Sequence, residues 1–142
     1  MRIDELFASA ASQGTTPVSF EMFPPKGELT LERAREVGSR FAELSPSFVS
    51  VTYSAGGSTN NAATTQIASM LTRELGITSC AHQTCISLHR EDLPAKIAEL
   101  RAAGIENVLA LRGDVPADAP TGPGCADYRY AMDIIPALVE AG

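Results

Sequence analysis

The chain has 142 residues, which is enough for one domain with a real core and too few for two ordinary domains. Its formal net charge is −6 and no run of Lys or Arg stands out, so we expect neither nucleic acid nor an anionic membrane surface as a partner. No apolar run approaches the ~20 residues that a membrane span needs. The N-terminal segment carries Asp4 and Glu5 where an export signal would need its apolar stretch. The spacing of Ile3, Leu6 and Phe7 predicts a short amphipathic helix there instead.

The cysteines are few and odd in number: Cys80, Cys85 and Cys125. In an acidic chain without an export signal, this set indicates the reducing cytoplasm and not a disulfide framework. By strand parity Cys80 and His82 share one face while Cys85 points to the other, so the converging ligands of a zinc site are missing. We therefore expect no metal.

Strand-like and helix-like segments alternate along the chain. Four segments have the β-branched and aromatic residues, bounded by Gly or Pro, that are typical of strands: 17–23, 46–54, 77–87 and 106–113. Four more have apolar residues at helical spacing: 29–44, 60–75, 90–104 and 130–142. Gly76 and Gly104 are suited to end two of these helices, and Pro136 should start a new turn or kink the last one.

This β-α alternation predicts parallel strands joined by right-handed crossovers. Two architectures fit the pattern: an open doubly wound sheet, or part of a (βα)₈ barrel. Neither a G-x-G-x-x-G turn nor a Walker loop occurs, so the fingerprints of the nucleotide-binding folds are absent from the sequence.

Each expected strand carries polar or charged residues near its C-terminal end. They are Glu21, then Thr52 and Tyr53, then His82, Gln83 and Thr84, and finally Arg112 and Asp114. Parallel α/β folds place their active sites at that end of the strands, where the βα loops converge. The pattern favours a catalytic or cofactor-binding edge over a purely structural domain.

Two of these residues have alternative interpretations. Glu21 lies among apolar neighbours, where an ionised carboxylate is costly, and this suits a general acid. It could equally be a strand-end glutamate that faces solvent or pairs with an arginine. His82 is either a neutral histidine hydrogen-bonded in a pocket or a satisfied core histidine.

The tripeptide at 112–114 ends the last expected strand abruptly. Gly113 would let the backbone approach a ligand closely or turn sharply. Arg112 and Asp114 would then present a donor fork and a carboxylate to that ligand, or else form a local ion pair. The small-residue segment 54–61 could likewise enclose a ligand, or be a plain connection with Asn60 capping the next helix.

With these pieces placed, the sequence resembles the methylenetetrahydrofolate reductase family, specifically its bacterial single-domain type. The resemblance rests on five stretches in register: "VSFEMFPPK" (18–26), "FVSVTYSAGGS" (48–58), "AHQTCI" (81–86), "GIENVLALRGDVP" (104–116) and "YRYAMDII" (128–135). It implies a (βα)₈ barrel that holds FAD at the C-terminal ends of its strands. It also implies reduction of 5,10-methylenetetrahydrofolate to 5-methyltetrahydrofolate with NADH or NADPH, as part of one-carbon and methionine metabolism.

The resemblance also implies roles for individual residues. Glu21 matches the catalytic glutamate that protonates folate N10, and Asp114 matches an aspartate near flavin and folate that tunes the flavin potential. Thr52 matches a nicotinamide contact. The matches to FAD contacts are Tyr53, Ala55, His82, Arg112, Gly113, Tyr130 and Ala131.

The chain holds only about the first four βα units of such a barrel, whose usual length is ~250 residues. We therefore expect a single partial domain over residues 1–142. Three states remain open: a fragment, a chain that pairs with itself or another chain, or a portion of a longer protein. Activity, flavin binding alone and no activity are all compatible with the sequence. The resemblance further implies a homo-oligomer.

Overall fold

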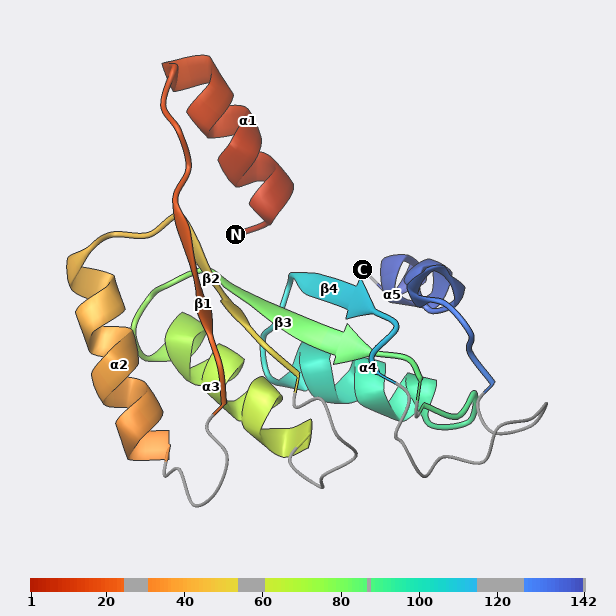
Figure 1. Ribbon diagram of the computed structural model, residues 1–142. Helices are drawn as coiled ribbons and strands as arrows, with labels where there is room; N and C mark the ends of the chain where they lie inside the picture. The colour runs from red at the N-terminus through yellow and green to blue at the C-terminus, as the bar shows by residue number, and fades with distance from the viewer. Residues whose placement is uncertain (25–30, 54–60, 87, 115–126, 142) are drawn as a thin grey trace.

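The computed structural model describes residues 1–24, 31–53, 61–86, 88–114 and 127–141 (Figure 1). The predicted N-terminal helix is present as α1 (Ile3–Gln13). All four predicted strands are present, each shorter than its sequence segment: β1 (Ser19–Met22), β2 (Phe48–Val51), β3 (Ser79–Thr84) and β4 (Val108–Leu111).

The strands form a parallel sheet in the order β1-β2-β3-β4. A doubly wound sheet reverses its strand order at a switch point, whereas a barrel adds each strand beside the one before it. The sequential order therefore decides between the two predicted architectures for the described residues. The fold class is α/β, with four βα units of a (βα)₈ barrel.

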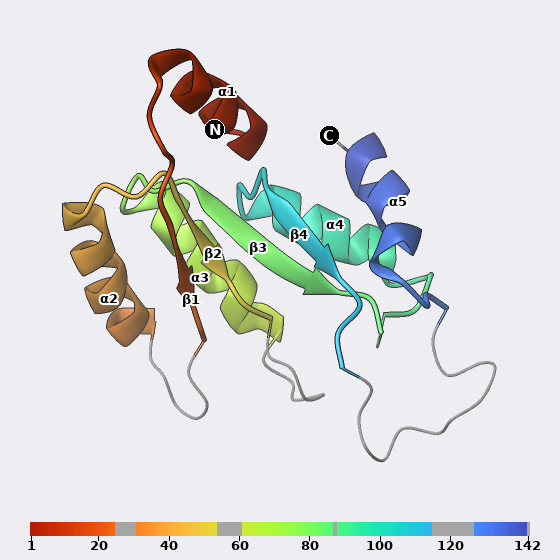
Figure 2. The same cartoon turned by 45° about the horizontal axis from the view of Figure 1, so that its top comes forward.

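The crossover helices lie on one face of this sheet, as Figure 2 shows. They are α2 (Leu31–Glu43), α3 (Asn61–Arg73), α4 (Leu93–Ala102) and α5 (Ile135–Glu140). We call the face that they cover the outer face and the opposite one the inner face. A doubly wound sheet would carry helices on both faces, so this one-sided arrangement also agrees with a partial barrel.

The main core fills the space between the outer face and the helices. Alternate residues of each strand enter it, and Val49 and Val51 of β2 are completely buried. The helices contribute the residues that the helical spacing predicts, among them Ala34 of α2 and Leu71 of α3. Burial of one strand parity and one helix face is what holds the helices to the sheet.

A second, smaller core lies under α4 and α5. It contains Cys85, Leu93, Tyr128 and Ile134, all buried. The last predicted helix is divided into a short 3₁₀ helix, η1 (Ala131–Asp133), and α5. Pro136 lies in the first turn of α5, so the prediction that it starts a new turn is confirmed.

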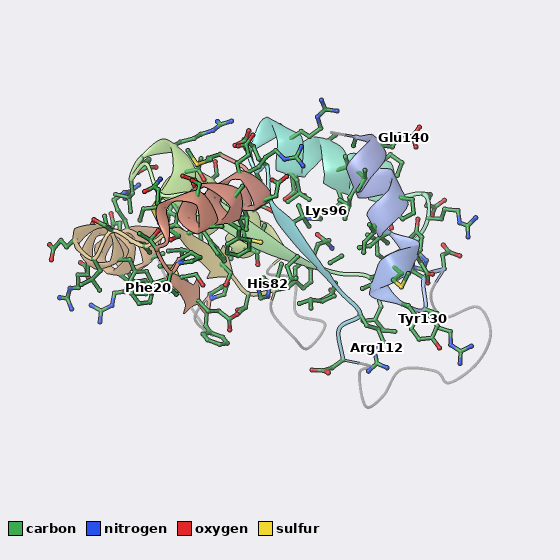
Figure 3. The ribbon with its side chains drawn as sticks, turned by 90° about the horizontal axis from the view of Figure 1, so that it is seen from above. Phe20, His82, Lys96, Arg112, Tyr130 and Glu140 are labelled. Carbon is green, nitrogen blue, oxygen red and sulfur yellow. The ribbon has the colours of Figure 1, made fainter. Side chains whose placement is uncertain are left out.

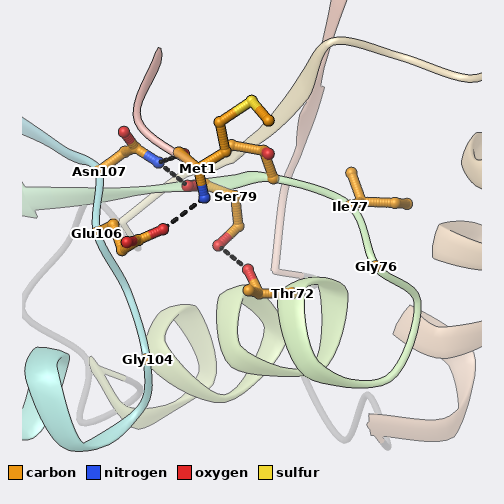
Figure 4. Close-up of a pocket in the computed structure, with 9 residues that line it drawn as sticks. Met1, Thr72, Gly76, Ile77, Ser79, Gly104, Glu106 and Asn107 are labelled. Atoms are coloured by element: carbon orange, nitrogen blue, oxygen red, sulfur yellow. Dashed lines mark hydrogen bonds and ion pairs between the residues drawn. The ribbon is translucent and has the colours of Figure 1, made fainter. Parts of the chain in front are cut away.

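Helix α1 lies at the N-terminal ends of the strands. Asn107 joins it to the sheet: its side-chain amide donates to the carbonyls of Met1 and Ser79, at 3.1 Å each, and accepts from the Ile3 N–H at 2.9 Å (Figure 4). The Thr72 and Ser79 hydroxyls pair with each other in the same pocket at 2.7 Å. These groups satisfy one another, so this end of the sheet is a structural joint.

Replacing Leu71 with Ala tests the main core. Leu71 is completely buried between α3 and the sheet, so we expect L71A to lower the free energy of unfolding by about 2–5 kcal/mol. Urea denaturation followed by circular dichroism measures the change. Gln66→Ala, at an exposed position of the same helix, is the control. Equal unfolding midpoints for the two variants would contradict this account of the core.

Candidate active site

The predicted site residues begin at the C-terminal half of β1. Strand parity places Phe20 and Met22 toward the helices, which leaves Glu21 on the inner face. The register pairs Glu21 with Ser50, and Ser50 with Cys80 on the next strand. The inner face therefore carries polar side chains on three adjacent strands.

Glu21 and His82 are brought together on this face. The Glu21 Oε2 atom lies 3.7 Å from His82 Nε2, and the Ser50 hydroxyl lies 3.5 Å from the same carboxylate oxygen. The Glu21 side chain is 47% exposed while that of His82 is only 8% exposed. One side of the carboxyl thus faces solvent and the other faces a buried imidazole.

The His82 Nε2 atom is buried and has no hydrogen-bond partner among the residues that the structure describes. Burial lowers the pKa of His82 below its ordinary value, and the Glu21 carboxylate offsets part of this decrease. The imidazole is therefore neutral at pH 7. An unpartnered nitrogen distinguishes His82 from a satisfied core histidine and indicates a site prepared for a partner.

Thr52 and Tyr53 follow β2 at the same edge. The Thr52 N–H donates to the Met22 carbonyl at 3.0 Å, and the Thr52 carbonyl accepts from the Thr64 hydroxyl at 2.9 Å. These bonds fix the Thr52 backbone to β1 and to α3. Burial raises the pKa of the Tyr53 phenol, and hydrogen bonds with the side chains of Gln83 and Thr84 offset part of the increase. Ala55, in the segment 54–61, lies outside the described residues.

In the segment after β4, Gly113 has a left-handed backbone with φ +84°. A Cβ atom there would lie 3.0 Å from Thr84 Cβ and from Ile86 Cγ2, so the close approach is to the protein's own β3 side. The Ile86 N–H also donates to the Arg112 carbonyl at 2.9 Å. Residues 112–114 form neither a turn nor a bend, so the sharp turn expected at Gly113 is not observed, and close approach to a ligand stays a prediction.

Arg112 and Asp114, on either side of Gly113, are both exposed. The Arg112 Nε atom donates to the Gly113 carbonyl at 3.2 Å. Within the described part of the chain the two side chains form no ion pair with each other. The predicted local pair is therefore absent, and both charges face solvent.

Tyr130 and Ala131 begin the 3₁₀ helix η1 on the far side of β4. Tyr130 is 55% exposed, and the Arg129 guanidinium lies 5.4 Å from the centre of its ring. Figure 3 shows Arg112 and Tyr130 toward β4 and α5, and His82 toward the middle of the sheet. The predicted site residues thus form two groups: one around Glu21 and His82, and one at the end of β4.

Sequence reasoning missed two polar residues that organise these groups. Ser50 is one, because a serine inside a strand gives no signal by itself. Asp133 is the other: it accepts from the backbone N–H groups of Arg129 and Tyr130 at 2.8 Å each, and these bonds lower its pKa. An acidic residue three positions after a helix start is the signal that could have identified it.

The cysteines contribute no reactive group in the described residues. Cys80 and Cys85 are buried and free, on opposite faces of the sheet as strand parity predicts. Burial raises the pKa of Cys80 to about 11. No cluster of three or more His, Cys, Asp or Glu residues suited to a metal occurs in the part of the chain that the structure describes. Among the same residues, no helix has the length and apolar character to span a membrane.

Replacing Gly113 with Ala tests the left-handed backbone and the close packing at this position. The left-handed backbone alone costs an L-residue about 1–2 kcal/mol, and the contacts with Thr84 and Ile86 add to that cost. Gly14→Ala is a matched control, because Gly14 has φ +63° but no atom within 4 Å of an added Cβ. Urea denaturation should show a larger loss of stability for G113A than for G14A. Equal losses would mean that the packing against Thr84 and Ile86 is loose.

Comparison with known proteins identifies the family of the chain. The family model described as Methylenetetrahydrofolate reductase matches residues 6–141. Methylenetetrahydrofolate reductase (NADH) 1 of Arabidopsis thaliana is 38% identical over 116 residues, which cover 82% of this chain and 19% of the plant protein. The 5,10-methylenetetrahydrofolate reductase of Pectobacterium carotovorum is 35% identical over 133 residues, which cover 94% of this chain and 43% of that protein.

The chain therefore spans less than half the length of these relatives. The match nevertheless extends from α1 to α5 and includes both groups of site residues. The resemblance seen in the sequence is confirmed: the chain belongs to the methylenetetrahydrofolate reductase family.

Proposed function

We propose that this chain carries the acid and part of the cofactor-binding edge of a flavin-dependent reductase. The reaction is conversion of 5,10-methylenetetrahydrofolate to 5-methyltetrahydrofolate with NADH or NADPH. The observation that carries the proposal is the Glu21 carboxyl, half-exposed at the C-terminal edge of β1 with buried His82 behind it, in a chain of this family. That edge is where (βα)₈ enzymes carry out their chemistry.

Glu21 is the catalytic acid in this proposal. Opening of the five-membered ring of the folate leaves a basic nitrogen, N10, that needs a proton, and the solvent-facing side of the Glu21 carboxyl can deliver it. The neighbouring imidazole is neutral at pH 7, so His82 places no fixed positive charge against the carboxyl. A neutral neighbour is compatible with a carboxyl group that must carry a proton before the reaction and lose it during the reaction.

The residues at the end of β4 are suited to FAD. The cofactor combines an anionic diphosphate with a planar ring system. Arg112 offers a guanidinium that no carboxylate engages among the described residues, and exposed Tyr130 offers an aromatic face. FAD, when bound, supplies the hydride transfer from nicotinamide to folate. Arg112, Gly113, Tyr130 and Ala131 would hold it on the β4 side.

The remaining assignments belong to the same proposal. Tyr53, Ala55 and His82 would complete the FAD contacts, and Thr52 would contact the nicotinamide. Asp114 would place a negative charge near the flavin and so influence its reduction potential. The plant relatives bear names that specify NADH, which supports NADH as the first electron donor to test. Location in the cytoplasm and assembly into a homo-oligomer remain predictions from the sequence.

Flavin titration of the chain tests the cofactor assignment. We expect that addition of the protein quenches FAD fluorescence. We also expect that NADH, added without oxygen, bleaches the flavin absorbance near 450 nm, because flavins lose this absorbance when they take up roughly two electrons per FAD. Arg112→Ala should weaken FAD binding, because it removes the guanidinium. Lys96→Ala, which removes a cation paired with Glu99 on α4, is the control for a general loss of charge. Equal weakening by both variants would contradict a role of Arg112 at the diphosphate.

Glu21→Gln tests the acid. We expect reoxidation of the reduced flavin by methylenetetrahydrofolate to slow by roughly 10²- to 10⁴-fold, because the amide cannot donate the required proton. Reduction of the flavin by NADH should change little. Rapid-mixing absorbance separates the two steps, and Glu140→Gln, at an exposed position of α5, is the control. Equal loss in both steps would contradict the role of Glu21.

A second candidate function is flavin binding without turnover. It is favoured by the extent of the chain, which covers 43% of the bacterial relative and whose described sheet leaves β1 and β4 with one neighbouring strand each. Binding of FAD without bleaching by NADH would select this function. Absence of both, together with a non-cooperative thermal transition, would select an inactive fragment.

A further inference from the structure

The contact between Glu21 and His82 connects strands that are not neighbours. Glu21 is on β1 and His82 on β3, and β2 lies between them. Adjacent strands are ~4.8 Å apart, so the two backbones are separated by roughly twice that distance. A separation of 3.7 Å between Oε2 and Nε2 therefore requires the side chains of Glu21 and His82 to reach toward each other over β2.

Ser50 is the residue that Glu21 passes over. It is paired with Glu21 in the sheet register, and its hydroxyl lies 3.5 Å from Glu21 Oε2. The inner-face side chain at this position stands between β1 and β3, so its size decides whether the carboxyl can cross. Serine is short enough to leave the path open and polar enough to contact the carboxylate.

The far side of the crossing ends at an unpartnered nitrogen. His82 Nε2 is buried and finds no hydrogen-bond partner in the described ranges, and the Glu21 carboxylate oxygen lies opposite it at 3.7 Å. Both contacts of the carboxyl are longer than the ~3.2 Å limit of a good hydrogen bond, so a small rotation of the half-exposed Glu21 side chain closes or opens them. In the structure the carboxyl lies on the side of Ser50 and His82.

We propose that Ser50 and His82 are positioning residues for Glu21: Ser50 keeps the path across β2 open, and His82 Nε2 holds the carboxyl at its inner end. The Nε2–H tautomer donates to the carboxylate and accounts for the otherwise unpartnered nitrogen. This assigns Ser50 a role that the sequence does not suggest. It also gives His82 a role toward the acid in addition to any contact with a cofactor.

The role of Ser50 and His82 in the reaction rests on the proposed function. Glu21 gives its proton to N10 of the folate, and the O–H bond of the carboxyl breaks as the N–H bond forms. The carboxylate left behind then accepts the hydrogen bond from His82 Nε2–H. His82 neither gains nor loses a proton in this step, so it acts through Glu21.

The groups around His82 allow the effect of Glu21 on the His82 titration to be measured. The Glu21 carboxylate of β1 lies 3.7 Å from His82 Nε2, and Leu109 of β4 is the register partner of His82. Cys80, on the same strand and face as His82, pairs with Ser50 of β2. Burial raises the pKa of the Cys80 thiol to about 11, so that group is neutral near pH 7. Within the described residues, Glu21 is the charged group that acts on the His82 imidazole.

Nuclear magnetic resonance of the histidine rings tests the pair directly. The chain has two histidines, and His89→Gln removes one set of signals and so assigns the other to His82. In that background, we expect Glu21→Gln to lower the pH at which His82 titrates, because the carboxylate stabilises the imidazolium. Glu140→Gln should leave the His82 titration where it is. An unchanged titration in Glu21→Gln would overturn the proposal.

Two substitutions at position 50 distinguish the effect of side-chain size from the effect of the hydroxyl group. Ser50→Ala keeps the path open, whereas Ser50→Val fills it with two methyl groups and suits a strand. We expect S50V to lower the pH at which His82 titrates, as Glu21→Gln does. We expect S50A to leave that pH close to its value in the His89→Gln background. Equal shifts in both variants would overturn the role of size at this position. Glu21→Gln is at a half-exposed site, so the test of the pair stands even if S50V fails to fold.

A kinetic readout extends the test to the reaction. We expect S50V to slow folate-dependent reoxidation of the flavin by roughly 10- to 100-fold, the effect of misplacing a reacting group by about 1 Å, with little change in reduction by NADH. A normal folate step in S50V would overturn the positioning role. If the chain shows no turnover at all, the proposed function fails, and the histidine titrations still decide whether Ser50 and His82 position Glu21.

Discussion

Side chains along a strand alternate between two faces, and the helices of this chain cover only one of them. Burying Met22, Val49, Val51 and Ala81 against α2 and α3 provides the main core. The same alternation leaves every second residue on the inner face. The helices do not cover this face, so its side chains need not be apolar. Glu21, Ser50 and His82 are placed together because the residues between them are committed to the core.

Parallel pairing adds the second constraint. All four strands run in the same direction, so their C-terminal ends share one edge of the sheet. The backbone at that edge is held by specific bonds: Thr52 to Met22 and Thr64, and Ile86 to Arg112. These bonds belong to the framework, which leaves the side chains of Glu21, Arg112 and Asp114 exposed for other partners.

Burial at the sheet determines the electrostatic character of the site. His82 is neutral at pH 7 because desolvation outweighs the attraction of the Glu21 carboxylate. In the group at the end of β4, Asp133 accepts hydrogen bonds from backbone N–H groups. Arg112 has no carboxylate partner in the described part of the chain. The Glu21 carboxyl thus lies at β1, whereas Arg112 and Asp114 carry opposite charges at the end of β4.

The sequence by itself determined the order of elements, the apolar faces of α2 and α3, the break at Pro136 and the family, since each depends on local periodicity, a single residue type or a motif. It could not choose between a doubly wound sheet and a barrel, because both have the same β-α alternation. Only the tertiary structure decided the sequential strand order, the absence of an Arg112–Asp114 pair in the described residues, and the crossing of Glu21 over Ser50 to His82. These depend on which strands become neighbours and on the space between them, and residues far apart in the chain fix both.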